Sequence, residues 1–360
     1  MKTKSLIRSL AIGMALLLST SLMGVCWGAE PIKIGIIHAL SGWAAMYSVN
    51  HLKGHEVARD EYNAAGGILG RRIQYIVRDH MSKSDVARRV AEELILREKV
   101  HFLMGVILTP CGLAVSEVAK QYKVLLVDSN IKSPEGTDRF GHRYIASVAA
   151  DSVYEGGAMA ILEKDTPSKT YWTIAMDYAY GHNIIDEVGK KLKEVKPEAK
   201  IIGESWVKPG ETELTPYITK ILASKPDGII GVLMAVSFQN FFKQQAPYGL
   251  LNKTRMINAA VMASPEFLNP IAKEIPDGVV LNGWHHPDYP DKQLNKTFIK
   301  NYLNATGETF VPGTAAQSYI ASQVLFEAIK KAGTIETEKV VDAFSMIEID
   351  TPRSTHCCPK

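Results

Sequence analysis

The chain has 360 residues, with 41 Lys and Arg against 38 Asp and Glu, and a formal net charge of +3. Lys2, Lys4 and Arg8 account for all of that excess, so the rest of the chain is formally neutral. A neutral chain excludes the strongly basic nucleic-acid binders, which need a positive face to displace counterions. The roughly 330 residues that follow the N-terminal segment are too many for one ordinary core, so we expect two domains.

Residues 1–29 have the pattern of a Sec signal peptide. Three basic residues precede the apolar run Leu10–Val25, and small residues follow at Gly28 and Ala29. The run is shorter than the ~20 residues of a membrane span, and no stop-transfer pattern follows it, which disfavours a retained anchor. Lipoprotein processing at Cys26 is also disfavoured, because Val25 precedes it where a small residue is needed. We expect export to the periplasm.

From Ile32 the chain alternates short apolar runs with amphipathic stretches. Nearly continuous apolar runs are typical of parallel strands that are covered on both faces. Strands are predicted at Ile32–Ile37, Ile73–Val77, Phe102–Met104 and Val124–Val127, and helices at Val49–Ala65, Ser84–Glu98 and Gly112–Tyr122.

After Ser147 the alternation begins again. Strands are predicted there at Thr173–Met176, Ile201–Val207, Gly228–Val232, Met256–Ile257 and Val279–Leu281, and helices at Val153–Leu162, Gly181–Lys193, Leu214–Ser224, Ser237–Gln245, Lys292–Ala305, Thr314–Ala332 and Glu338–Phe344. Two rounds of strand and helix predict an α/β fold with two doubly wound lobes. Ligands of open α/β sheets sit beyond the carboxyl ends of the strands, so we expect the site in the cleft between the lobes.

One ordered set of motifs resembles a known family. In the string Tyr62–Arg71, Gly66 and Gly67 are suited to a positive φ where the first helix ends. The other motifs are Ile34–Gly42, Asp79, Gly105, Ala175–Gly181, Lys225–Asp227 and Tyr248–Leu250. Together they resemble the type I periplasmic solute-binding proteins of ABC importers, in the branched-chain amino acid and amide-binding group. The resemblance extends from about Ile32 to Pro352.

The resemblance implies the domain organisation and the function. Lobe one would comprise residues 30–147 and 284–340, and lobe two residues 148–283, joined by a hinge of three segments; residues 341–360 would form the hinge return and a tail that departs from the family pattern after Arg353. The chain would capture a small polar solute (an amino acid, an amide or an organic or aromatic acid) and deliver it to a membrane permease. We expect a monomer without a cofactor. A clamp that feeds a receptor or regulator, and an exported α/β enzyme, are the alternatives.

In lobe one, the resemblance implies three ligand loops. The first, Ser41–Tyr47, places Trp43 and Tyr47 at the ligand, although Trp43 is as well explained by packing against lobe two. In the second, Leu108 and Thr109 precede a helix whose N-terminus suits a carboxylate or carbonyl; an ordinary helix cap is the alternative for Thr109. The third loop supplies its candidates at Ser129, Asn130 and Lys132. Lys132 is free to pair with an acidic ligand or with Asp128, or to remain solvated.

In lobe two, Tyr178 and Tyr180 are the ligand candidates, and the stretch Ile257–Met262 lacks the acid that amino-acid binders use to hold an ammonium. Because an uncompensated ammonium in a closed cleft is costly, either Asp128 or Asp177 substitutes or the ligand carries no ammonium. We favour the second. His285 and His286 lie either at the cleft mouth or in an uninvolved loop.

Other chemistry finds little support. His51 and His55 are four residues apart on a predicted helix, but a zinc site needs a third ligand, so no metal is expected. No nucleophile elbow or nucleotide loop is present, and Cys111 has no convincing catalytic partner. The four cysteines form no spaced disulfide framework. We therefore expect a binding protein and not an enzyme.

Overall fold

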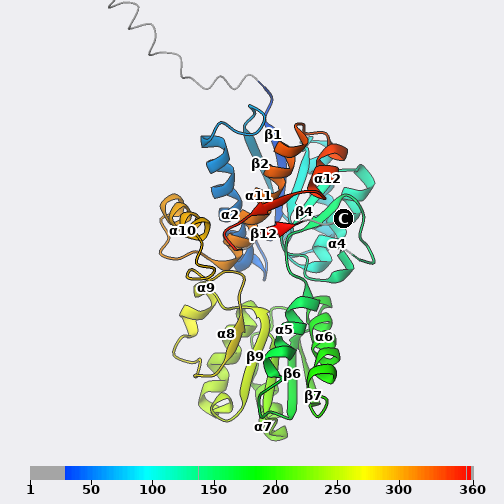
Figure 1. Ribbon diagram of the computed structural model, residues 1–360. Helices are drawn as coiled ribbons and strands as arrows, with labels where there is room; N and C mark the ends of the chain where they lie inside the picture. Colours follow the sequence, from blue (N-terminus) through cyan, green and yellow to red (C-terminus); the bar gives the residue numbers. More distant parts are fainter. Residues whose placement is uncertain (1–28, 137, 354, 358–360) are drawn as a thin grey trace, which may run out of the picture.

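The computed structural model describes residues 29–136, 138–353 and 355–357. Of the predicted signal peptide, residues 1–29, only Ala29 is described, and Cys26 lies outside the described residues. Within them the chain forms two α/β lobes, one above the other in Figure 1, and the predicted fold class is confirmed.

The first lobe is built on a five-stranded parallel sheet with the order β2-β1-β3-β4-β5. Its strands are β1 (Ile32–His38), β2 (Ile73–Asp79), β3 (Phe102–Gly105), β4 (Leu125–Asp128) and β5 (Ile145–Ser147). The register pairs Ile34 with both Tyr75 and Phe102. Apart from β2 and β5, these strands are almost wholly buried, as the continuous apolar runs predict.

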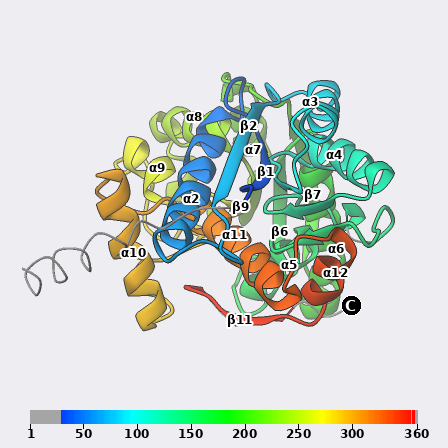
Figure 2. The ribbon, with the colours of Figure 1, turned by 90° about the horizontal axis from the view of Figure 1, so that it is seen from above.

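Helices cover both faces of this sheet. One layer contains α2 (Ala45–Ala64), α10 (Gln293–Thr306), α11 (Gly313–Ala332) and α12 (Thr337–Phe344), and the other contains α3 (Ser84–Leu96) and α4 (Thr109–Tyr122). Figure 2 shows α2 and α11 side by side, although 248 residues, 65–312, separate them in the chain. The two helices approach closely at Gly54, where an added Cβ would lie 2.0 Å from the Ala315 carbonyl oxygen.

The second lobe repeats the same plan. Its parallel sheet has the order β10-β9-β8-β6-β7, formed by β6 (Thr170–Met176), β7 (Lys200–Val207), β8 (Gly228–Val232), β9 (Arg255–Val261) and β10 (Val280–Asn282). Numbered within its own lobe, each sheet has the order 2-1-3-4-5. The helices are α5 (Ser152–Glu163), α6 (Ala179–Val195), α7 (Thr215–Ser224), α8 (Ala235–Gln245) and α9 (Pro265–Leu268). Helices α5 and α6 pack together, as do α7 and α8.

The remaining elements are short. They are the 3₁₀ helices at Pro134–Gly136, Ala246–Tyr248, Leu250–Asn252 and Asn269–Ile271, and an antiparallel pair of strands, β11 (Glu348–Asp350) and β12 (Thr355–Cys357). The sheets fall on either side of the predicted lobe boundaries, whose exact positions remain a prediction. No helix in the described part of the chain combines the length and apolarity that a membrane crossing needs.

Candidate functional site

A small cavity lies where the carboxyl ends of the two sheets meet. The segments that follow β3, β4, β6 and β8 all contribute to it, as expected for doubly wound sheets. Its lining residues are Tyr47, Ile107, Leu108, Thr109, Asn130, Lys132, Tyr178, Tyr180, Met234, Val261 and Trp284. None of these is acidic. The cavity volume is about 10 Å³, which is close to the space that one water molecule needs.

Three helices begin at this cavity. Helix α4 starts at Thr109, α6 at Ala179 and α8 at Ala235, and the residues next to these starts line the cavity. The first turn of a helix carries unpaired N–H groups and a partial positive charge. The backbone around the cavity therefore favours carbonyl or anionic oxygen.

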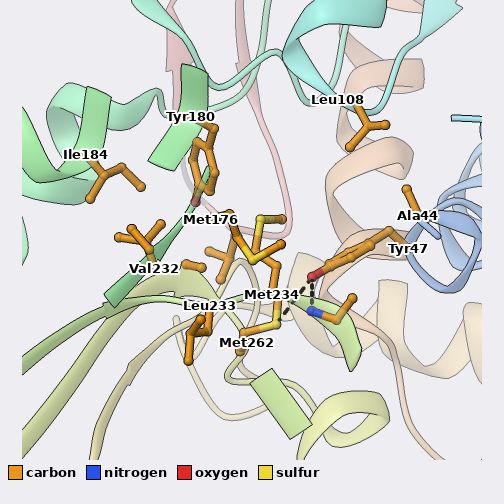
Figure 3. Close-up of a cluster of buried hydrophobic side chains, with 14 of the residues drawn as sticks. Ala44, Tyr47, Leu108, Met176, Tyr180, Ile184, Val232, Leu233, Met234 and Met262 are labelled. Atoms are coloured by element: carbon orange, nitrogen blue, oxygen red, sulfur yellow. Dashed lines mark hydrogen bonds between the residues drawn. The ribbon is translucent and has the colours of Figure 1, made fainter. Parts of the chain in front are cut away.

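Tyr47 spans the two lobes. It lies in the first turn of α2, which begins at Ala45 and not at the predicted Val49. Tyr47 is 1% exposed. Its hydroxyl oxygen accepts a hydrogen bond of 2.7 Å from the Ala235 backbone N–H at the start of α8, and lies 3.4 Å from the Met262 sulfur. Figure 3 shows the Tyr47 side chain reaching toward Met262. The structure is thus a closed arrangement in which lobe one caps a helix of lobe two.

Lys132 forms a second link between the lobes. Its Nζ donates to Glu155 Oε1 of α5 at 2.9 Å and to the Ala150 carbonyl at 2.8 Å, and it lies 5.2 Å from the centre of the Trp284 ring. The other oxygen of Glu155 accepts a 2.7 Å hydrogen bond from the Tyr180 hydroxyl. Burial raises the pKa of Glu155, and Lys132 opposes that rise. Lys132 is therefore neither solvated nor paired with Asp128, and its partner Glu155 has no place among the predicted site residues.

Asp128 holds the third loop in shape. Its carboxylate accepts hydrogen bonds from the backbone N–H groups of Asn130 and Ile131 and from the Ser147 hydroxyl. Burial raises the pKa of Asp128 to about 7 against the effect of these hydrogen bonds. The carboxylate lies outside the cavity lining, so it provides no counterion for a ligand ammonium there.

Four buried histidines lie behind the cavity: His38, His51, His55 and His80. The His38 ring lies 5.4 Å from the rings of both His51 and His55. The Asn130 amide donates to His51 Nε2 at 3.2 Å, which connects the cluster to the cavity. Burial lowers the pKa of all four, to about 3 for His55 and about 4 for His80. Within the described ranges, no group of three or more His, Cys, Asp or Glu residues could hold a metal ion.

Two of the predicted ligand residues lie outside the cavity lining. Trp43 lies at a neighbouring opening, with its ring 6.3 Å from that of Tyr178 in lobe two, which fits the alternative of packing against that lobe. Ser129 is fully buried, and its backbone N–H donates to the carbonyl of Gly105, the last residue of β3. The structure brings the other seven together, namely Tyr47, Leu108, Thr109, Asn130, Lys132, Tyr178 and Tyr180. Their contact with a ligand remains a prediction.

The remaining candidates lie outside the cavity lining. Asp177 is exposed and bonds to His182 at 2.9 Å, so it does not replace the missing counterion. His285 is buried against Asn295, and His286 lies in an exposed loop. Burial raises the pKa of the Cys111 thiol to about 12, which makes it a poor nucleophile.

Four lining residues were not predicted as ligand contacts: Ile107, Met234, Val261 and Trp284. Ile107 and Val261 could not be identified from the sequence, because an apolar residue at the end of a strand is as typical of the hydrophobic core as of a ligand site. Met234 and Trp284 each lie two residues beyond the end of a strand, β8 and β10 respectively. Their position at the carboxyl ends of strands is the signal that could have identified them.

Comparisons with known proteins identify the family. The family model described as periplasmic binding protein matches residues 31–357. A Leu/Ile/Val-binding protein homolog of Brucella suis is 24% identical over 359 residues, covering 94% of this chain and 87% of that protein. A solute-binding protein of an ABC transporter from R. palustris, solved with benzoate, has a TM-score of 0.81 at 18% identity and covers 91% of this chain and 89% of its own. A leucine-binding protein from Thermotoga maritima has a TM-score of 0.79 at 20% identity, covering 90% and 93%.

Proposed function

This chain belongs to the periplasmic binding protein family, and we propose that it encloses a small amide, carboxylate or aromatic acid between its lobes for delivery to the permease of an ABC importer. Its function is solute binding, in line with its relatives. The charge pattern of the cavity is the observation that carries the choice of ligand class.

An amino-acid ammonium has no counterion at this cavity. No lining residue is acidic, and both oxygens of the nearby Glu155 are already occupied by Lys132 and Tyr180. A buried ammonium without a partner is costly. By contrast, Thr109, Asn130 and the start of α4 offer neutral donors to a carbonyl or carboxylate oxygen. The R. palustris protein, which binds benzoate, supports the view that this fold accommodates an acid without an ammonium.

Entry of such a ligand requires the lobes to separate. The cavity of about 10 Å³ is too small for an organic acid, and the Tyr47 hydrogen bond to α8 closes it. Opening at the hinge exposes the N-terminus of α4 on lobe one, where the ligand binds first. Closure then buries it, and the ligand shifts the equilibrium by its greater affinity for the closed form.

A ligand screen tests the proposal. Thermal-shift measurements with amino acids, amides, urea and aromatic acids identify candidates, because a ligand that binds the folded state raises the apparent stability. Calorimetry then gives the Kd for the wild type, for Thr109→Val and for Thr219→Val, the last being a matched control on the exposed face of α7. We expect Thr109→Val to weaken binding roughly tenfold, because one buried hydrogen bond to a ligand oxygen is lost.

Micromolar binding of leucine or valine, together with no binding of any amide or acid, would contradict the proposed ligand class. Conversion of a ligand into product by the purified protein would contradict a pure binding role. Periplasmic export is part of the proposal, and cell fractionation with N-terminal sequencing of the mature protein tests it. Uptake of the labelled ligand by cells with and without the protein tests delivery to a permease.

A further inference from the structure

A second pocket opens beside the hinge and is separate from the central cavity. This hinge pocket has a volume of about 340 Å³. Tyr154, Ala158, Val261 and Trp284 supply apolar surface, and Arg353 is one of its two charged residues. Val261 and Trp284 line both spaces, so these two side chains form the wall between them.

The guanidinium of Arg353 has only neutral partners in the described part of the chain. Its Nη1 donates to Gln317 Oε1 at 2.7 Å and to the Trp284 carbonyl at 3.3 Å. No ion pair to a described carboxylate compensates its charge. Burial lowers the pKa of Arg353, because the charged form is withdrawn from water without an anion beside it. A guanidinium nevertheless stays charged in proteins, so this arrangement favours an external anion.

The other charged residue of the pocket is already neutralised. Glu155 accepts from Lys132 through one oxygen and from Tyr180 through the other. The charge left over in the hinge pocket is therefore that of Arg353. In addition, the Trp284 indole N–H is buried and has no hydrogen-bond partner among the described residues. Among the described residues, the pocket lining thus includes one cation without an ion-pair partner, and one lining residue, Trp284, has a buried N–H without a hydrogen-bond partner.

We propose that the hinge pocket binds a small monocarboxylate, with the carboxylate on Arg353 and the apolar body against Tyr154, Ala158 and Val261. One guanidinium beside the apolar surface of Tyr154, Ala158 and Val261 matches a ligand with one charge and a hydrophobic remainder. This site goes beyond the proposed function, because it lies outside the central cavity and is independent of the solute that the lobes enclose. Its occupant packs against Trp284, which is also a wall of that cavity.

The experiment uses benzoate as the probe and benzamide as its neutral isostere. Binding is followed by the ¹⁵N-correlated signal of the Trp284 indole N–H, assigned with Trp284→Phe, and by calorimetry. We expect a saturable shift of the indole signal with benzoate. The affinity for benzamide should be weaker than that for benzoate by roughly tenfold or more. Arg353→Met should weaken benzoate binding by roughly 10- to 100-fold, the range for loss of charge-assisted hydrogen bonds. Arg353→Lys should retain part of the affinity, since it keeps the charge but not the fork of donors.

Arg143→Met is the matched control, because Arg143 is a half-exposed arginine of lobe one that pairs with Glu338 and Asp342. It should leave benzoate affinity unchanged. If Thr109→Val abolishes the benzoate shift and Arg353→Met does not, benzoate occupies the central cavity; the hinge-pocket proposal is then wrong and the proposed function stands. Equal affinity for benzoate and benzamide, or no saturable shift with benzoate, also overturns it. If Arg353→Met fails to fold, Arg353→Lys and the benzamide comparison decide.

Discussion

His55 provides a direct test of the buried histidine cluster. The imidazole is fully buried, its Nδ1 lies 2.8 Å from the Ser322 hydroxyl, and its Nε2 has no hydrogen-bond partner among the described residues. Burial lowers its pKa from 6.5 to about 3. In the unfolded chain this group takes up a proton as the pH falls below 6.5, whereas in the folded protein it stays neutral down to about pH 3. Stability is therefore insensitive to His55 above pH 6.5 and falls with the pH below that value.

The magnitude follows from linkage. Each unit of pH between the two pKa values changes the free energy of unfolding by about 1.4 kcal/mol. Between pH 7.5 and pH 5.0, the titration of His55 therefore lowers the free energy of unfolding of the wild type by about 2 kcal/mol. The variant His55→Gln lacks this group, so its loss over the same interval should be smaller by about 2 kcal/mol. Other titrating groups, including Asp128 with its raised pKa, are present in both proteins and cancel in the difference.

The assay is urea-induced unfolding at pH 7.5 and pH 5.0, with the free energy extrapolated to water for each protein. Ser322→Ala is the matched control, because it removes the partner of His55 and keeps the imidazole. It should lower stability by about 1 kcal/mol at both pH values and preserve the pH dependence. If the wild type and His55→Gln lose the same free energy between the two pH values, the burial argument for His55 is refuted.

Three further predictions concern packing and the links between the lobes. Lys132→Met should lower the free energy of unfolding by about 3–5 kcal/mol because the buried Glu155 loses its ion-pair partner, and adding Glu155→Gln should recover much of that loss in urea titrations. Tyr47→Phe removes the hydrogen bond to α8, worth about 1 kcal/mol, and should shift the lobes roughly fivefold toward the open form, as measured by single-molecule FRET between them. Gly54→Ala should destabilise the protein by about 1–3 kcal/mol in thermal melts, whereas Gly157→Ala in α5, where an added Cβ meets nothing within 4 Å, should not.

The order of the helices and strands was predictable because most of the apolar runs are long enough to show the hydrophobic pattern of a helix or a strand. The first strand was expected at Ile32–Ile37 and is observed at Ile32–His38. The positive φ angles expected at Gly66 and Gly67 are 99° and 75°. By contrast, β5 at Ile145–Ser147 has three residues. A strand of that length has no periodicity, and only its pairing with β4 distinguishes it from a loop.

The sequence by itself determined the two α/β rounds and the absence of a carboxylate in the stretch Ile257–Met262, and its resemblance to a known family pointed to the seven residues that meet at the cavity. These depend on local patterns and on motif order. Only the tertiary structure decided the partners of the buried charges. Lys132 pairs with Glu155, 23 residues further along the chain, because the hinge folds α5 back against the loop that follows β4. Similarly, His55 meets Ser322 through the packing of α2 on α11. Such pairs arise from the way distant segments fill space together, and no local pattern in the chain encodes them.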